Sequence, residues 1–567
     1  MSASPAAEVD IARMMAHLEV FARRVKLSGS PEELESFHYL EATLRGYGFA
    51  TDLILHDAYI SLPGAASLDV DGSAIRCITH SFSRPSPEGG LAGEVVYAGR
   101  GTEAELLAAG IEGRIALIEG LAAPAPSDAA SRHGAIGQIH ISAHEHLHEM
   151  CISPVWGSPT EATRQRLPRT IVLTVSAEDG GAIRDRLRAG GRVTARMLAS
   201  VDTGWRKIPL LVADMHRLGA AAAEPFVLFS GHHDTWHFGV MDNGSANATM
   251  LEVARVAAAG RARWRRGLRL CFWSGHSHGR YAGSTWYADH HWAELAARCV
   301  AHVNCDSTGG KGATVLADAL SSTELRGLAA EAVLTEGQQQ ITGLRMSRAG
   351  DASFWGIGIP SLFMGMGEQP AGEGANVAGA ILAGAGEVRK GAGFGWWWHT
   401  PDDTLDKIDP DLLARDTRIY VHAIWRLLAD EVLAHDYARF AGDLLGVLDA
   451  LDAALGDKFE LGRLRARVRV LQDDAAALDA SGADASRINQ AKMRLGRALV
   501  PIDYTHGNRF DHDPALKLPA YPLLDPLRAL AAAPAGSDAA KFAEVAARRA
   551  TNRIADAIDQ AIAATRL

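Results

Sequence analysis

Apolar residues recur at helical intervals at the start of the chain and at strand-like intervals further on. Two stretches before residue 60 have the helical spacing, IARMMAHLEVFARRV and PEELESFHYLEATLRGYG, and the second ends at a glycine. Between about 94 and 200 the apolar runs become short and are bounded by glycine, as in GEVVYAGRG, GRIALIEG and TIVLTVS. The pattern predicts two opening helices followed by a β-rich module.

From about 205 to 405, apolar strands alternate with helical stretches. FVLFSGHHD, LRLCFWSG and VAHVNCDS resemble buried strands, and ATMLEVARVAAAG and STWYADHHWAELAAR resemble helices. This alternation is typical of an α/β domain with a mostly parallel, doubly wound sheet. Beyond Pro410 the chain is rich in Ala, Leu and Arg with helical spacing, apart from a Pro-rich loop between Pro501 and Pro526. We therefore expect an α/β domain formed by 1–60 and 205–409, a β-rich insert at 61–204, and a helical C-terminal domain at 410–567.

Composition excludes several classes of protein. The 567 residues are 47% apolar and 22% charged, which is typical of a globular protein with two or three domains. The first residues, MSASPAAEVDIARMM, have neither the basic region nor the apolar stretch of a secretory signal, and the five cysteines show no CxxC spacing. A net charge of -10 with interspersed Lys and Arg does not favour a nucleic-acid surface. We expect a cytoplasmic protein with no nucleic-acid or membrane partner.

Residues able to bind a metal follow the predicted strands of the α/β domain. Ligands of parallel sheets bind beyond the carboxyl ends of the strands, so side chains at successive strand ends are expected to converge. Each residue alone has a commoner interpretation, such as a helix cap, a turn residue or a surface histidine. Their occurrence in order at one sheet edge favours a two-metal site instead. The predicted ligands are His232, Asp242, His278, Asp306 and His399.

Neighbouring residues suggest how such a site is supported. Asp234 lies two positions after His232 and is expected to hold the His232 ring, while His233 is expected to point away. Arg280 or Arg348 is a candidate for binding a substrate carboxylate, although a core or solvent role is commoner for such residues. Aromatic walls near the metals are suggested by Trp236, Phe394 and Trp396 to Trp398.

Six segments of the chain together resemble one family. SGHHDTW, MDNGSANA, YAGSTWYA, VNCDSTGG, GDASFWGIGIPSLFMG and WWWHTPDDTLDKID are similar, in order and spacing, to segments of the zinc aminopeptidase, glutamate carboxypeptidase and transferrin receptor family. The β-rich insert resembles a protease-associated domain, and the helical tail resembles the receptor-type dimerisation domain. The resemblance thus covers nearly the whole chain and implies a homodimer.

The resemblance also implies how the ligands are divided. One metal is held in the family at the positions of His232, Asp242 and Asp306, and the other at those of Asp242, His278 and His399. The family's aspartate two residues after the first histidine corresponds to Asp234, and Asp351 matches a position near the substrate pocket. The peptide bond after Asp242 is expected to be cis.

The sequence departs from the family at the position of its general base. The family has two adjacent glutamates, the first a general base and the second a ligand. When the family's GST segment is aligned with Gly283, Ser284 and Thr285, Ser277 and His278 occupy the positions of these two glutamates. An imidazole can replace a carboxylate ligand, and the resulting donor set suits one or two divalent ions, zinc first but also Mn or Fe. A serine is not a general base near neutral pH, however. His276 or His237, a substrate carboxylate, or a reaction that needs no strong base would each account for the change, and we favour His276 as the catalytic replacement.

Three functional hypotheses follow. The first is a metal-dependent hydrolase of an amide or amine-bearing small molecule or peptide-like substrate. The second is a metal-dependent lyase that uses the same site. The third is a catalytically inactive binding protein, which the full set of metal-capable residues disfavours.

Overall fold

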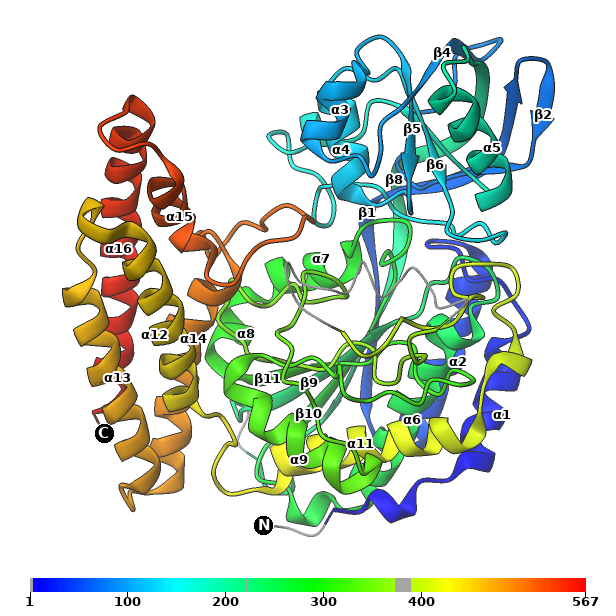
Figure 1. Ribbon diagram of the computed structural model, residues 1–567. Coiled ribbons are helices and arrows are strands. Elements are labelled where there is room, and N and C mark those ends of the chain that lie inside the picture. Colours follow the sequence, from blue (N-terminus) through cyan, green and yellow to red (C-terminus); the bar gives the residue numbers. More distant parts are fainter. Residues whose placement is uncertain (1–3, 221–222, 373–388, 567) are drawn as a thin grey trace.

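The computed structural model of the protein describes residues 4–220, 223–372 and 389–566 (Figure 1). The two expected opening helices are present, as α1 (Ile11–Phe21) and α2 (Pro31–Gly46), after the short η1 (Ala6–Glu8). Asp10 caps α1 by accepting a hydrogen bond from the backbone N–H of Arg13. Ser30 caps α2 in the same way and is followed by a proline, a residue suited to the first helical position.

The central sheet is mostly parallel, as the alternation of strands and helices predicted. Its strand order runs β12-β11-β9-β10-β8, with β8 antiparallel to β10 and the other neighbours parallel. The strands are β8 (Thr194–Met215), β9 (Phe226–His232), β10 (Gly267–Trp273), β11 (Cys299–Asn304) and β12 (Ser361–Leu362).

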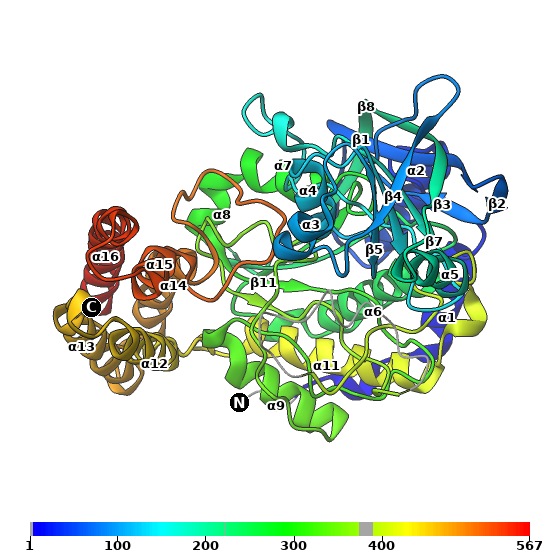
Figure 2. The same cartoon turned by 45° about the horizontal axis from the view of Figure 1, so that its top comes forward.

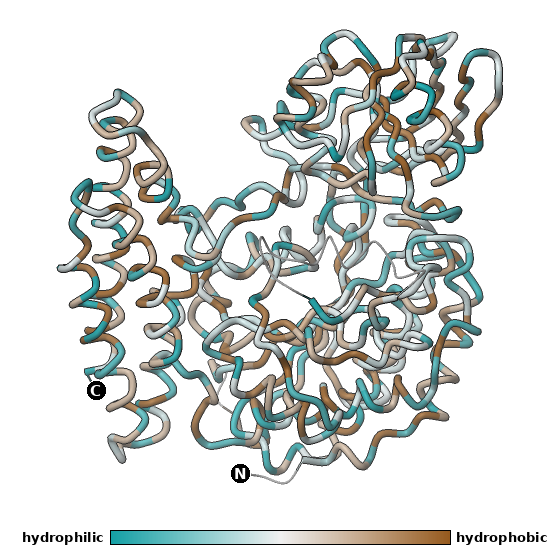
Figure 3. Tube along the Cα trace, in the orientation of Figure 1, coloured by the Kyte–Doolittle hydropathy of each residue, from teal (hydrophilic) through white to brown (hydrophobic). Residues whose placement is uncertain are grey.

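Both faces of this sheet are covered by helices. Alternate residues of β10 point to opposite faces: Leu270 and Phe272 pack in one hydrophobic core, and Cys271 and Trp273 in another. Figure 3 shows hydrophobic and hydrophilic residues interspersed along the trace of the chain. On the first face lie α1, α2, α6 (Ala246–Ala259), α9 (Arg326–Gly337) and α11 (Pro410–Ala429), and on the second lie α7 (Ala282–His290) and α8 (Trp292–Arg298). Short helical turns connect them: η3 (Val240–Ser245), η4 (Arg261–Arg263), η5 (Thr323–Leu325) and η6 (Leu405–Lys407).

The insert is joined to the central domain by two long strands. β1 (Ala50–Val70) pairs with β8 along nearly its whole length, and β8 then pairs with β4 of the insert, so one sheet runs through both parts. The expected divisions at 60/61 and 204/205 therefore fall inside continuous strands. The other elements are β2 (Ser73–Ile75), β3 (Cys77–Thr79), β4 (Leu91–Tyr97), α3 (Glu103–Ala109), β5 (Ile115–Glu119), α4 (Pro124–Arg132), β6 (Gly137–Ile141), η2 (Arg164–Arg166), β7 (Ile171–Val175) and α5 (Ala177–Arg188).

A helical bundle follows and stands beside the central domain (Figure 2). The apolar face of α11 packs in the core of the central domain, whereas a separate hydrophobic core begins at Tyr437. The bundle thus starts one helix after the expected division at 409/410. Its elements are α12 (Tyr437–Leu455), η7 (Gly456–Lys458), α13 (Gly462–Ala480), α14 (Ala485–Tyr504), η8 (Pro522–Leu524), α15 (Asp525–Ala532) and α16 (Asp538–Thr565). Among the helices described, none combines the length and apolar character needed to cross a membrane.

Candidate metal centre

Three parallel strands deliver the expected ligands to one edge of the central sheet. Trp273, the last residue of β10, is paired with His232, the last residue of β9. In β11, Asn304 is paired with Ser230, so this strand ends at the same edge. Asp306 and the loop with His278 follow directly, which explains why side chains far apart in the sequence meet here.

Asp242 lies between two of the histidines. Its Oδ1 is 3.2 Å from Nε2 of His232, and its Oδ2 is 3.0 Å from Nε2 of His399. Oδ2 of Asp306 is 3.7 Å from the same nitrogen of His232. A carboxylate that faces one imidazole with each oxygen has the arrangement needed to bridge two cations.

The loop that carries Asp242 is held by residues that the sequence did not single out. The Asp403 carboxylate accepts hydrogen bonds from the backbone N–H groups of Met241 (2.8 Å) and Asp242 (3.0 Å). This role joins loops about 160 positions apart, so no local sequence pattern indicated it. The peptide bond between Asp242 and Asn243 is cis, as the family resemblance implied.

The three histidines expected to bind metal are each anchored through Nδ1. His232 Nδ1 donates to the carbonyl oxygen of Asp234 (2.9 Å), and His399 Nδ1 donates to that of Glu149 (2.7 Å). His278 Nδ1 is 2.9 Å from the hydroxyl of Ser28. Such bonds orient imidazole rings so that Nε2 remains for a metal.

Several buried atoms of the site make no hydrogen bond within the described part of the chain. Nε2 of His278 is one, and Nε2 of His232 and Oδ1 of Asp242, which face each other at 3.2 Å as a potential ion pair, are the others. Burial lowers the pKa of His232, but the Asp242 and Asp306 carboxylates outweigh it and raise this pKa well above its usual value. The surroundings thus stabilise positive charge at this position, and the donors fit a divalent cation.

Asp234 acts differently from the role expected for it. Its carbonyl oxygen, rather than its carboxylate, holds the His232 ring, since Oδ1 is 3.7 Å from His232 Nδ1. The carboxylate instead accepts hydrogen bonds from the backbone N–H groups of His276 (3.2 Å) and Ser277 (2.9 Å). Asp234 therefore shapes the turn that contains His276 and Ser277. His233 points away, as expected, and hydrogen-bonds to Ser36 in the core.

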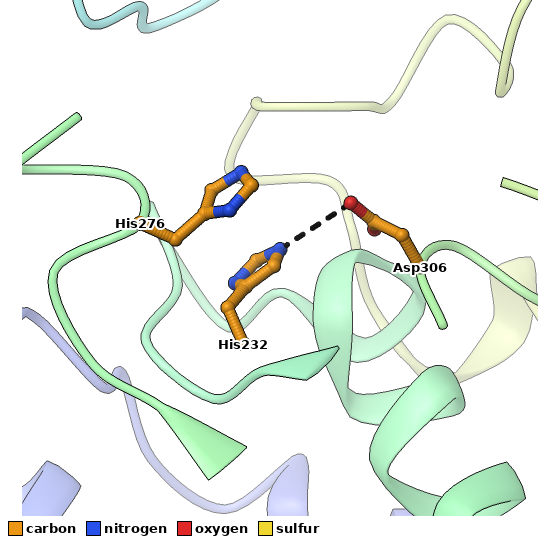
Figure 4. Close-up of side chains that lie close together, drawn as sticks. All are labelled: His232, His276 and Asp306. Carbon is orange, nitrogen blue, oxygen red and sulfur yellow. Dashed lines mark ion pairs between the residues drawn. The ribbon is translucent and has the colours of Figure 1, made fainter. Parts of the chain in front are cut away.

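His276 lies against the predicted ligands (Figure 4). Its ring stacks on that of His232, with centroids 3.7 Å apart and planes 12° apart. One nitrogen of each ring and one oxygen of Asp306 all lie within 4.8 Å of one another. Nδ1 of His276 is 2.8 Å from Oδ2 of Asp351, a carboxylate that is 1% exposed. Asp351, which the sequence placed only near the substrate pocket, is thus the partner of His276.

His237 and Ser277 are placed less favourably than His276 for proton transfer. His237 Nε2 lies 3.8 Å from a carboxyl oxygen of Glu149, and burial lowers the pKa of His237 to about 4. The Ser277 side chain is buried, and its hydroxyl has no hydrogen-bond partner.

A small cavity opens beside these groups. Its polar lining includes Asp242, His276, Arg280, Asp306 and His399. Of the aromatic residues expected as walls, Phe394 and Trp398 line it. Trp236 instead packs against His278 with ring centroids 4.5 Å apart, and Trp396 stacks on His146 of the insert.

The α/β fold matches that of zinc aminopeptidases, and this cluster of donors lies at one edge of its central sheet. Residues 212–424 match the model of Peptidase family M28. This part of the chain is therefore similar to peptidase family M28, and homologous segments occur in zinc metallopeptidases.

The curated relatives are named as carboxypeptidases or aminopeptidases. The chain is 25% identical over 369 residues to the probable glutamate carboxypeptidase VP8 of Zea mays, which covers 54% of this chain and 51% of the relative. It is 31% identical over 103 residues to the aminopeptidase NAALADL1 of Mus musculus, covering 18% of this chain and 14% of the relative. The chain spans about half the length of the first curated relatives it matches.

Solved structures share the fold. A zinc aminopeptidase from Bacillus subtilis matches with a TM-score of 0.56 at 19% identity, over 76% of this chain and 98% of that one. An aminopeptidase from Aneurinibacillus sp. strain AM-1 matches with a TM-score of 0.54 at 21% identity, over 75% and 95% of the two chains. At these identities the similarity concerns the fold alone.

Proposed function

We propose that the protein hydrolyses an amide bond of a small, peptide-like or amine-bearing substrate, with His276 in place of the general base glutamate. The observation that carries this proposal is the pair formed by His276 and Asp351, 2.8 Å apart, beside the predicted ligands. A histidine oriented by a buried carboxylate is a common arrangement for proton transfer.

We assign one divalent ion to His232, Asp242 and Asp306, and a second to Asp242, His278 and His399. Zinc is the ion that the family favours, and Mn or Fe suits the same donors. When bound, such ions polarise a carbonyl oxygen and make water easier to deprotonate.

The residues of the chain supply the proton steps. His276 accepts a proton from the attacking water through the ring nitrogen that does not face Asp351. It then returns this proton to the nitrogen of the leaving amine, so that the protein is unchanged after one turnover. Asp351 holds the ring in place, and the stacked His232 ring limits its tilt.

Isotopic analysis of the products separates this function from the two alternatives. Zinc-loaded protein is incubated in H₂¹⁸O with N-acyl amino acids, dipeptides and amino-acid amides, and products are identified by mass. Hydrolysis places one ¹⁸O in the new carboxylate. Products formed without added water would show a lyase, and no turnover with Zn, Mn or Fe would favour a binding protein.

Two variants test whether the turnover belongs to this site. Asp242→Ala should abolish it, because both assigned ions lose a ligand. His38→Ala is the matched control, since the His38 side chain is 60% exposed on α2. Equal turnover in both variants would show that a different site is responsible.

A further inference from the structure

An arginine, Arg280, lines the cavity of the metal centre. Arg280 follows His278 by two positions and lies on the wall shared with Asp242 and His276. Across the described ranges 4–220, 223–372 and 389–566, no carboxylate forms an ion pair with it. Its Nε is buried and has no hydrogen-bond partner. Because Arg280 is half-buried at the cavity wall and its buried Nε has no partner among the described residues, this arrangement points to an anionic ligand.

The backbone holds Arg280 in an unusual conformation. Arg280 and Tyr281 both have positive φ angles, 50° and 72°, which are uncommon for residues with side chains. Gly157 of the insert donates its backbone N–H to the Arg280 carbonyl oxygen (2.7 Å). The neighbouring Trp156 packs on Tyr281, with ring centroids 4.4 Å apart. The insert thus fixes the turn that presents Arg280, which keeps the ordering cost of binding low.

The second arginine that the sequence suggested is already engaged. The Arg348 guanidinium donates to the carbonyl oxygens of Asp513 (2.8 Å) and Pro514 (3.3 Å), and it lies 4.7 Å above the Trp156 ring. Arg348 therefore joins the loop that follows α14 to the central domain. Of these two arginines, Arg280 is the one that lines the cavity and can contact a ligand there.

We propose that Arg280 binds the free carboxylate of the substrate, and that the substrates are N-acyl amino acids or dipeptides ending in an apolar residue no larger than leucine. This inference rests on the proposed amide hydrolysis. The cavity has a volume of about 80 Å³, and at roughly 10–15 Å³ for each water-sized group it holds about five to eight such groups, enough for a carboxylate and an apolar side chain of about four carbons. Its other walls include Met150, Met364 and Phe394, which suit an apolar side chain.

Matched ligands that differ only in the carboxylate test this proposal. The initial rates of hydrolysis of N-acetyl-L-leucine and N-acetyl-L-leucinamide are compared for the zinc-loaded wild type, Arg280→Gln and Arg280→Lys. Binding of L-leucine and L-leucinamide is measured by calorimetry in the same proteins. Arg192→Gln is the matched control, because the Arg192 side chain is 86% exposed in the insert.

The wild type should prefer the carboxylate of each pair. Arg280→Gln should lower kcat/KM for N-acetyl-L-leucine by about 10- to 100-fold, the range for a lost charged hydrogen bond, and change the rate for the amide by less than about threefold. Arg280→Lys should recover part of the preference. Equal losses for acid and amide, or no preference in the wild type, would overturn the proposal.

The two measurements also separate this proposal from the proposed function. If neither compound is hydrolysed but Arg280→Gln weakens binding of L-leucine and not of L-leucinamide, the carboxylate site stands and amide hydrolysis fails. If both compounds are hydrolysed equally well by all proteins, hydrolysis stands and the carboxylate site fails.

Discussion

His276 Nδ1 lies 2.8 Å from Oδ2 of Asp351, so a partly exposed imidazole of the cavity is held by a buried carboxylate. This contact joins the loop after β10 to a loop 75 positions further along the chain. It places an oriented histidine next to Ser277, the residue at the family's glutamate base position.

Replacing either member of this pair should slow turnover without removing the metal. His276→Ala should lower kcat by about 10²- to 10⁴-fold, the usual contribution of a positioned acid or base. Asp351→Asn should lower it by about 10- to 100-fold, as for other residues that orient a functional histidine. Both kcat and KM are measured, and metal content is determined in parallel.

The zinc content of these two variants distinguishes a role of His276 in proton transfer from a role as a metal ligand. Unchanged zinc with a lower kcat supports proton transfer by His276. Loss of zinc from His276→Ala would instead make His276 a ligand, consistent with its closeness to His232 and Asp306, and would contradict the role assigned to it. Turnover within about twofold of the wild type would contradict it as well.

Local sequence patterns predicted much of this site, because the strands determine it. His232, Asp306 and the loop with His278 follow three successive parallel strands, and the ends of such strands meet at one edge. The contacts of Asp351 and Asp403 could not be predicted in this way, since each depends on loops far apart in the sequence. The boundary between the α/β domain and the bundle could not be predicted either, because it depends on the packing of α11 in the core of the central domain.

His278 should hold one of the two ions. Its Nε2 is buried without a partner, and its Nδ1 is anchored on Ser28. His278→Ala should therefore retain about one equivalent of zinc where the wild type binds two, as expected when one of three ligands is lost. Mass spectrometry of the metal measures this, with His38→Ala as the control. Full retention of both ions would contradict the assignment of His278.

The buried Glu324 should make stability depend on pH. It is 1% exposed, both of its carboxyl oxygens lack hydrogen-bond partners, and burial raises its pKa to about 7. Because the folded protein holds this proton more tightly than the unfolded chain, the stabilisation is fully present below about pH 4.5 and is lost as pH rises to about 7.

Denaturant unfolding of Glu324→Gln at several pH values measures this effect. Between pH 5 and 8 the wild type should lose up to about 3 kcal/mol that the variant keeps. Glu161→Gln, at a side chain 81% exposed, should behave as the wild type. Parallel pH profiles for wild type and Glu324→Gln would show that the carboxyl group does not titrate in this range.

The homodimer stays a prediction of the family resemblance, and the cytoplasmic location stays a prediction from the sequence composition. Phe542 and Val545 are 77% and 55% exposed on α16, three residues apart and therefore on one side of this helix. We expect a solution mass of twice the 60.4 kDa of the chain, and a shift toward the monomer in Phe542→Glu combined with Val545→Glu. Sedimentation equilibrium gives both masses. A monomeric wild type would refute the dimer.

Anomalous diffraction at the zinc edge from crystals of the zinc-loaded protein tests the metal centre most directly. We expect two peaks from the assigned two-metal site, one beside Nε2 of His232 and one beside Nε2 of His399, each also adjacent to the Asp242 carboxylate. Each peak should lie about 2.0–2.2 Å from its nitrogen and oxygen ligands. No peak beside Asp242, or zinc bound only elsewhere in the chain, would contradict it.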